Sequence, residues 1–283
     1  MKLGVIYPQG EITDPAAAIE LARAAEASGI DHVLCYERQL GINPAIHPGF
    51  ESPWGPQAPF HEPLMLFALM AGHTTRLGFA TDVLVSPTRR TVVLAKQVAS
   101  LAVLSNNRFR LGIGVGASPA PYAQVGVDFH TRGAQQEEQM QLLRALWSEP
   151  EVAFEGRFHK LHGVGISPRP SQPVPIWLGG DSERVIDRIA RMGDGWFPYG
   201  VPDEANVARI DHLRSTAREN GRDPAAIGIE ANVGVSEGWA AIKERAAAWQ
   251  AADATHFAIN TMGLGTDPAT HIEAWKQFVG EVG

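Results

Sequence analysis

Several apolar runs in this chain stop at residues that can do chemistry. The run HVLCYE (32–37) ends at Glu37, LGFATDV (77–83) ends at Thr81-Asp82-Val83, and LGIGVG (111–116) ends in glycines. A carboxylate at such an end can accept hydrogen bonds from a ring or carry a proton when burial raises its pKa. Glycines let a flat ring or a phosphate approach the backbone closely. These endings indicate a small-molecule site, although a Glu37–Arg38 or loop salt bridge and close packing would also account for them.

Two glycine motifs could hold a phosphate. Gly179-Gly180-Asp181-Ser182 joins the run PIWLGG to a predicted helix capped by Asp181 or Ser182, so exposed amides and the helix dipole would favour an anion. The charge of Asp181 opposes a phosphate unless the side chain faces away, and an ordinary capped turn is the alternative. Gly112–Ala117 matches the letters of a dinucleotide fingerprint, but the next predicted helix begins only near Arg132, so a Rossmann site is not favoured.

Other catalytic classes lack their residue patterns. The 10 histidines include no H-x-H or HExxH motif, so a catalytic metal is not expected. A Gly-x-Ser-x-Gly elbow is missing, and the single cysteine, Cys35, lies inside an apolar run, which argues against covalent hydrolysis.

The elements around these residues alternate between strand and helix along the whole chain. About eight strand-like segments are each followed by a helix-like segment, and 152–163 has the pattern of a β-hairpin. This repetition predicts a (β/α)8 TIM barrel with insertions in its βα loops, formed by residues 1–283 as a single domain. The active site of such a barrel lies on the face built by the loops after the strands.

The loop at 38–62 is far longer than a usual βα loop. It contains Phe50, Trp54 and Phe60, and we interpret it either as a lid or substrate wall, or as a packed surface excursion or dimer contact.

The composition of the chain excludes some classes of binding partner. The net charge is -7 with no basic cluster, which argues against nucleic acid as a partner. No apolar run approaches the roughly 18 residues of a membrane span. A short strand directly after Met1-Lys2, without the pattern of a signal peptide, favours a cytoplasmic protein.

The stretch RLGFATDVLVSPTRRTVVLAKQVASLAVLSNNRFRLGIGVG (76–116) resembles the core signature of the bacterial luciferase-like flavin or deazaflavin oxidoreductases. The likeness continues through GVDFHTRGAQQEEQMQLLRALW (126–147), FEGRFHKL (154–161), PRPSQPVPIWLGG (168–180) and RIARMGDGWFP (188–198). Its compact length and SPTRR segment are most similar to the branch that depends on coenzyme F420. The resemblance implies a barrel that binds F420 or FMN at its carboxyl face.

Specific positions follow from this resemblance. Thr81-Asp82-Val83 would back the ring of the cofactor, with a cis peptide bond between Asp82 and Val83. The positions implied for the cofactor are Thr81, Asp82, Val83, Gly114, Gly116, Ala117, Tyr122, Gly179, Gly180 and Asp181. Glu37 matches an acidic or polar position near the ring, and His61 is a candidate proton donor.

Two departures weaken the assignment of catalytic residues. The Gly-Trp and Glu-Phe pairs that many relatives carry after the fourth strand are missing here, and Glu37-Arg38 replaces an Asp-His pair. The first hypothesis is an F420-dependent oxidoreductase that transfers a hydride between deazaflavin C5 and a small organic substrate. The alternatives are an FMN-dependent monooxygenase that uses oxygen and reduced flavin from a partner reductase, and a cofactor-free barrel that acts as a binding protein. The resemblance also implies a homodimer.

Overall fold

The computed structural model describes residues 1–47, 49–50, 52 and 54–283. Part of the loop interpreted above as a lid, at Pro48, Glu51 and Pro53, lies outside the described residues.

Over the described residues, eight parallel strands form a closed barrel, as predicted. The strands are β1 (Lys2–Ile6), β2 (His32–Cys35), β3 (Gly78–Thr81), β5 (Phe109–Gly114), β8 (Ile176–Gly179), β9 (Gly195–Phe197), β10 (Gly228–Gly234) and β11 (His256–Asn260). They lie in the order β3-β2-β1-β11-β10-β9-β8-β5, and pairing of Phe79 in β3 with Phe109 in β5 closes the ring. A two-residue strand, β4 (Leu84–Val85), extends this seam by pairing with Ile113 and Gly114.

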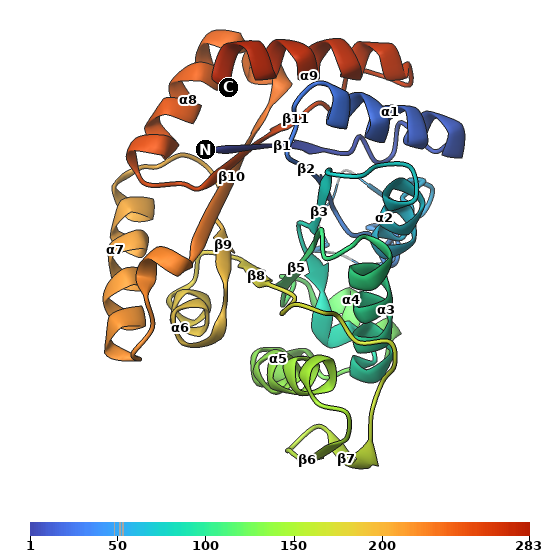
Figure 1. Cartoon of the computed structure of the whole chain (residues 1–283), viewed down its shortest axis with the longest axis vertical. Helices are drawn as coiled ribbons and strands as arrows, with labels where there is room; N and C mark the ends of the chain where they lie inside the picture. The colour runs from blue at the N-terminus through green and yellow to red at the C-terminus, as the bar shows by residue number, and fades with distance from the viewer. Residues whose placement is uncertain (48, 51, 53) are drawn as a thin grey trace.

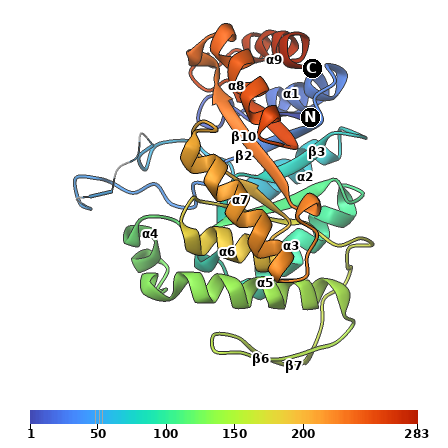
Figure 2. The ribbon, with the colours of Figure 1, turned by 90° about the vertical axis from the view of Figure 1, so that its left-hand side faces the viewer.

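Helices surround the strands on all sides (Figure 1). They are α1 (Pro15–Ala27), α2 (Pro63–Ala71), α3 (Thr91–Leu104), α5 (Arg132–Ser148), α6 (Glu183–Met192), α7 (Glu204–Glu219), α8 (Trp239–Ala251) and α9 (Pro268–Val282). The predicted hairpin is present as β6 (Val152–Glu155) and β7 (Lys160–Val164), at the edge of the molecule below α5 (Figure 2). Asp14 caps α1 as predicted, because its side chain accepts the Ala17 N–H and Pro15 occupies the first turn.

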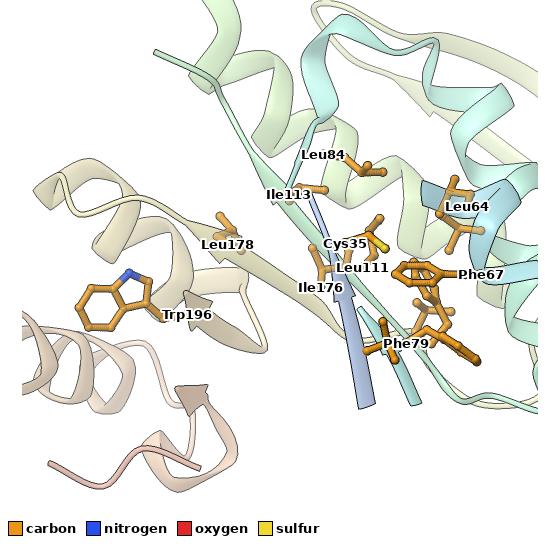
Figure 3. Close-up of a cluster of buried hydrophobic side chains, with 14 of the residues drawn as sticks. Cys35, Leu64, Phe67, Phe79, Leu84, Leu111, Ile113, Ile176, Leu178 and Trp196 are labelled. Carbon is orange, nitrogen blue, oxygen red and sulfur yellow. The ribbon is translucent and has the colours of Figure 1, made fainter. Parts of the chain in front are cut away.

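The main core lies between the outer face of the barrel and the helices. Figure 3 shows part of it, where Leu64 and Phe67 of α2 lie beside Cys35 and Phe79 from the strands. The rings of Phe67 and Phe79 are 5.2 Å apart. A smaller cluster fills the inside of the barrel and consists of Ile6, Leu34, Ala80, Trp177, Phe197 and Ala258. Strands that are buried on both faces explain the continuous apolar runs in the sequence.

The segment after β5 differs from the prediction. We expected irregular chain until about Arg132, whereas a short helix, α4 (Pro119–Gln124), begins three residues after Gly116. Ser118 caps it by accepting the Ala120 N–H, and Pro119 occupies the first helical position, where a missing N–H costs nothing. The two prolines that suggested a loop are therefore compatible with a helix start.

Candidate functional site

Four polar side chains lie where barrel strands end. Asp82 follows β3, and its Oδ2 is 3.5 Å from Nδ2 of Asn232 in β10. Nδ2 of Asn260, the last residue of β11, is 3.5 Å from the hydroxyl of Tyr36, which follows β2. Both distances are at the long limit of hydrogen bonding, so these groups keep the capacity to bind a ligand. We call this region the barrel mouth.

Val83 forms an apolar floor at one side of the mouth. The peptide bond between Asp82 and Val83 is cis, as the resemblance implied. The Val83 side chain lies against two glycines from neighbouring strands, because a Cβ built on Gly114 would be 2.8 Å from Val83 Cγ2 and one on Gly179 would be 3.2 Å from Val83 Cγ1. Any side chain at either glycine would displace Val83, so the two glycines shape the surface that Val83 presents.

A buried charged cluster lies at the opposite ends of the strands, deep in the barrel. Glu230 hydrogen bonds to His32 Nε2, and Arg110 Nη2 donates to its other oxygen at 2.8 Å. The Arg110 guanidinium stacks 4.3 Å from the centre of the Trp177 ring. Burial alone would raise the pKa of Glu230, but the charges of His32 and Arg110 outweigh it and hold that pKa at about 2. Glu230 thus stays ionised inside the barrel, paired with the Arg110 guanidinium.

Asp82 is the carboxyl of the mouth whose pKa responds to this cluster. Burial raises the pKa of Asp82 to about 7, and the negative charge of Glu230 adds to the effect while Arg110 opposes it. The carboxyl therefore exists in both protonation states near neutral pH. In one state it donates a hydrogen bond and in the other it accepts one.

A cavity of about 530 Å³ opens beside the mouth, and we call it the side pocket. Its walls come from residues 37–40 after β2, from the described residues between Gly49 and Trp54, from Val85 and Thr88, and from residues 116–122 around α4. The predicted residues Glu37, Gly116, Ala117 and Tyr122 all line it. The Tyr122 hydroxyl donates to the Val115 carbonyl at 2.6 Å, which fixes α4 against the end of β5.

Glu37 is held by protein groups on the wall of this pocket. Its side chain is only 2% exposed, and its two oxygens accept hydrogen bonds from the Val85 N–H at 2.6 Å and from Arg89 Nε at 2.8 Å. Burial raises the pKa of Glu37, whereas Arg89 and the Val85 amide oppose the rise. Arg89, 52 residues along the chain, thus takes the place of Arg38 as the ion-pair partner. This carboxylate is structurally engaged, and its catalytic role stays a prediction.

His61, the other predicted proton carrier, is exposed. Its Nε2 lies 2.9 Å from the Thr13 carbonyl, and it does not appear among the described residues that line the side pocket. The structure therefore does not bring His61 and Glu37 together in this cavity.

A second cavity, of about 390 Å³, lies where helices α5 and α6 begin, and we call it the anion pocket. Arg132, Gly133, Arg184 and Arg188 line it, together with Ser182. Neither Thr131 nor Ser182 caps its helix through the side chain. The Arg132 N–H donates to the Phe129 carbonyl, and the Val185 N–H donates to the Ser182 carbonyl. The Nε of Arg132 is buried without a hydrogen-bond partner among the described residues. Glu137 also lines the pocket, but Arg188 Nε binds it at 3.0 Å.

The glycine pair at 179–180 stands next to this pocket in sequence. Gly180 has a φ of +117°, a conformation that favours glycine, and its carbonyl accepts the Trp196 Nε1–H at 2.9 Å. Asp181 accepts the Tyr199 N–H at 3.4 Å and is not among the described residues that line the anion pocket. Its charge is thus directed toward Tyr199.

Thr81 has a clear structural role. Its hydroxyl donates to the Gly112 carbonyl at 2.7 Å and accepts the Gly112 N–H at 2.8 Å. A Cβ on Gly112 would lie 1.7 Å from the Thr81 carbonyl oxygen, so glycine is required for β3 to approach β5. These contacts hold the seam from which Asp82 and Val83 project.

Sequence reasoning missed the basic residues of the anion pocket and the charged cluster. Arg110 and Glu230 were visible as charges inside apolar strands, which is a signal for a buried pair. Arg132 and Arg184 carry no such signal, because they lie at the starts of two different helices that come together only in the folded barrel.

Two further findings concern the described residues only. None of their helices is long and apolar enough to cross a membrane. They include no group of three or more His, Cys, Asp or Glu side chains arranged to hold a metal ion.

The sequence is similar to those of known proteins. An uncharacterized protein of Mycobacterium tuberculosis is 36% identical over 221 residues, covering 73% of this chain and 74% of its own. An F420-dependent glucose-6-phosphate dehydrogenase of Amycolatopsis mediterranei is 33% identical over 64% of this chain and 53% of its own.

Solved structures share the fold. An F420-dependent secondary alcohol dehydrogenase in complex with an F420-acetone adduct has a TM-score of 0.80 at 16% identity, over 100% of this chain and 99% of its own. Monooxygenase RslO1 from Streptomyces bottropensis has a TM-score of 0.77 at 19% identity, over 100% of this chain and 98% of its own. The sequence profile of the luciferase-like monooxygenases matches residues 1–279. With its barrel, its cis Asp82–Val83 bond and this match, the chain belongs to the luciferase-like monooxygenase family.

Proposed function

We propose that this chain is an F420-dependent oxidoreductase that transfers a hydride between deazaflavin C5 and a small organic substrate. The observation that carries a phosphate-bearing cofactor is the anion pocket, where two helix starts and three arginines converge close to the barrel mouth. F420 is favoured over FMN by the relatives at 30–33% identity that are named F420-dependent.

The mouth fits a flat ring. Val83, seated on Gly114 and Gly179, offers an apolar face on one side, and a side chain at either glycine would disturb it. Asn232, Asn260 and Tyr36 offer donors and acceptors around the edge of the same opening. F420, when bound, supplies a C5 that accepts or donates a hydride.

The anion pocket fits a phosphate. The starts of α5 and α6 line it without a side-chain cap, and the Nε of Arg132, unpartnered among the described residues, lacks an acceptor that a phosphate oxygen would supply. Arg184 is exposed at its rim and adds charge for an acidic extension beyond the phosphate. An acidic tail of that kind distinguishes F420 from FMN.

The chain also provides a proton carrier. Asp82, with a pKa of about 7, can hold a proton on its carboxyl near neutral pH, and it is adjacent in sequence to the Val83 floor. Side-pocket walls formed by Trp54, Phe50 and Tyr122 would exclude water from a substrate that lies beside the ring.

Titration of the purified protein with F420 and with FMN, followed by fluorescence, tests the cofactor. We expect micromolar binding of F420 and much weaker binding of FMN. Binding of FMN alone would support the second candidate, an FMN-dependent monooxygenase supplied by a partner reductase, which the family's own description favours. Binding of neither would refute both enzyme proposals and favour a cofactor-free binding protein.

Arg132→Gln tests the phosphate assignment. We expect it to weaken F420 binding by about tenfold or more, because it removes a charge-assisted hydrogen bond. Arg191→Gln is the control: Arg191 binds Glu137, a residue of the pocket wall, at 3.0 Å but does not itself line the pocket among the described residues. An equal loss in both variants would contradict the assignment.

We also propose a homodimer in the cytoplasm. Every residue of α2 is apolar, yet Met65 is exposed, and Val92 and Val93 at the start of α3 are exposed as well. The helices α2 and α3 are neighbours, so these exposed side chains form an apolar surface that a second copy of the chain would bury. Analytical ultracentrifugation of the unmodified protein and of the double variant Met65→Glu, Val93→Glu tests this. We expect a dimer and a monomer respectively, and an unmodified protein that is already monomeric at micromolar concentration would refute the proposal.

A further inference from the structure

Arg38 is a cation on the wall of the side pocket without a carboxylate partner among the described residues. Its Nη2 donates to the neutral hydroxyl of Ser52 at 2.7 Å, and its Nε is buried with no hydrogen-bond partner there. Burial lowers the pKa of Arg38, and no described carboxylate counteracts that effect. Burial therefore destabilises the charged guanidinium, and the described protein groups do not compensate for this.

The other charged group on this wall does not neutralise Arg38. Glu37 uses its oxygens on Arg89 and on the Val85 amide, and Arg89 in addition binds Glu62 at 2.8 Å. Glu37 and Arg38 are the charged residues among the described residues that line the pocket. Over the described residues, the side pocket thus presents one positive charge that no carboxylate neutralises.

Aromatic rings surround this charge. The Arg38 guanidinium carbon lies 5.4 Å from the centre of the Trp54 ring and 5.9 Å from that of Phe50. Trp54 in turn packs edge-on against Phe60, with centroids 5.2 Å apart, and lies 6.4 Å from Tyr36 at the barrel mouth. The rings hold the guanidinium in place and give the remainder of the pocket apolar walls.

We propose that Arg38 binds the carboxylate of the substrate, and that the substrate is an organic acid whose apolar or cyclic body lies against Trp54. This inference rests on the proposed function for the reaction, but the pocket itself is a property of this chain. A volume of about 530 Å³ suits a small or medium molecule. The path from Arg38 past Trp54 to Tyr36 would direct the far end of such an acid toward the barrel mouth.

The same chemistry could come from a second source, because a γ-glutamyl tail on F420 also carries carboxylates. The two sources give different results when Arg38 is changed. A substrate site affects binding of free acids and leaves the cofactor unaffected. If Arg38 instead binds the tail, changing it weakens the binding of glutamylated F420 but not of the shortened cofactor that ends at the phosphate.

The experiment measures binding of benzoate, phenylacetate and cyclohexanecarboxylate, each beside its primary amide, by calorimetry with the full chain, alone and with F420. We expect the acids to bind at least tenfold more tightly than the amides, because the acid gains a charge-assisted pair with Arg38. Arg38→Gln should abolish that preference, and Arg38→Lys should retain part of it. Arg90→Gln, which removes an exposed arginine outside the pocket, should change nothing.

Three outcomes would overturn the inference. One is that no acid binds the unmodified protein, and another is that acids and amides bind it equally. The third is that Arg38→Gln weakens only glutamylated F420. Circular dichroism checks that Arg38→Gln folds, and Arg38→Lys provides the same comparison if it does not. Failure of F420 to bind would refute the proposed reaction. It would leave the preference for acids over amides unaffected, because that preference is measured on the protein without cofactor.

Discussion

Replacement of Asp82 by asparagine should stabilise the protein, and more so at high pH. The unfolded chain ionises this carboxyl near pH 3.8, whereas the folded protein does so near pH 7. Between these values the folded state binds more protons than the unfolded state, so stability falls as pH rises and the loss is complete above about pH 7. Asp82→Asn keeps the size of the side chain and removes this titration.

The magnitude follows from the two pKa values. Each unit is worth about 1.4 kcal/mol, which gives an upper limit of about 4 kcal/mol well above pH 7. Because Asp82 keeps partial exposure to solvent, we expect about 2–4 kcal/mol at pH 8 and about half of that at pH 5.5.

Urea unfolding of both proteins at pH 5.5 and pH 8, without cofactor, measures the difference. Asp211→Asn, which makes the same exchange at an exposed position on α7, is the control. A gain from Asp82→Asn that is the same at both pH values, or no gain, would show that Asp82 ionises like an ordinary aspartate. The role of Asp82 as a proton carrier near neutrality would then fail as well.

Three other substitutions probe the parts that support the site. Glu230→Gln should destabilise the fold by about 3–5 kcal/mol at pH 7, because it leaves the largely buried Arg110 guanidinium without its carboxylate. The loss should shrink below pH 4, and urea titrations that show no such loss would contradict the buried cluster. Gly228→Ala should cost about 1–3 kcal/mol or more, because its Cβ would meet the Trp177 ring at 2.3 Å, and an unchanged melting temperature would be inconsistent with this packing. Tyr122→Phe should cost about 1 kcal/mol through the lost bond to the Val115 carbonyl, measured by the same unfolding assay, and no change would mean that this bond contributes nothing.

The barrel could be predicted because each buried strand has its own apolar run and is followed by a helix-like segment. Asp14-Pro15 marked the start of α1 correctly, since that signal is local. The strand ends also marked the mouth, because parallel strands bring their carboxyl ends to one face. Local patterns thus identified where Asp82 and Gly179 lie.

Contacts across the barrel could not be read from the sequence. Glu37 has Arg38 beside it in the chain, yet it pairs with Arg89, because the closing sheet brings the start of α3 against the end of β2. The anion pocket depends in the same way on α5 and α6, whose first turns are about 50 residues apart. Such pairings are set by curvature of the sheet, which no local pattern encodes.

Arg89 has a consequence for how this protein can change. It binds Glu37 at one end of the loop after β2 and Glu62 at the other, so both ends of that loop are fastened to one guanidinium. With both ends fixed, the entropy of closing the loop grows only slowly with its length. We therefore expect that an insertion or graft between Arg38 and His61 changes the wall of the side pocket while the barrel still folds.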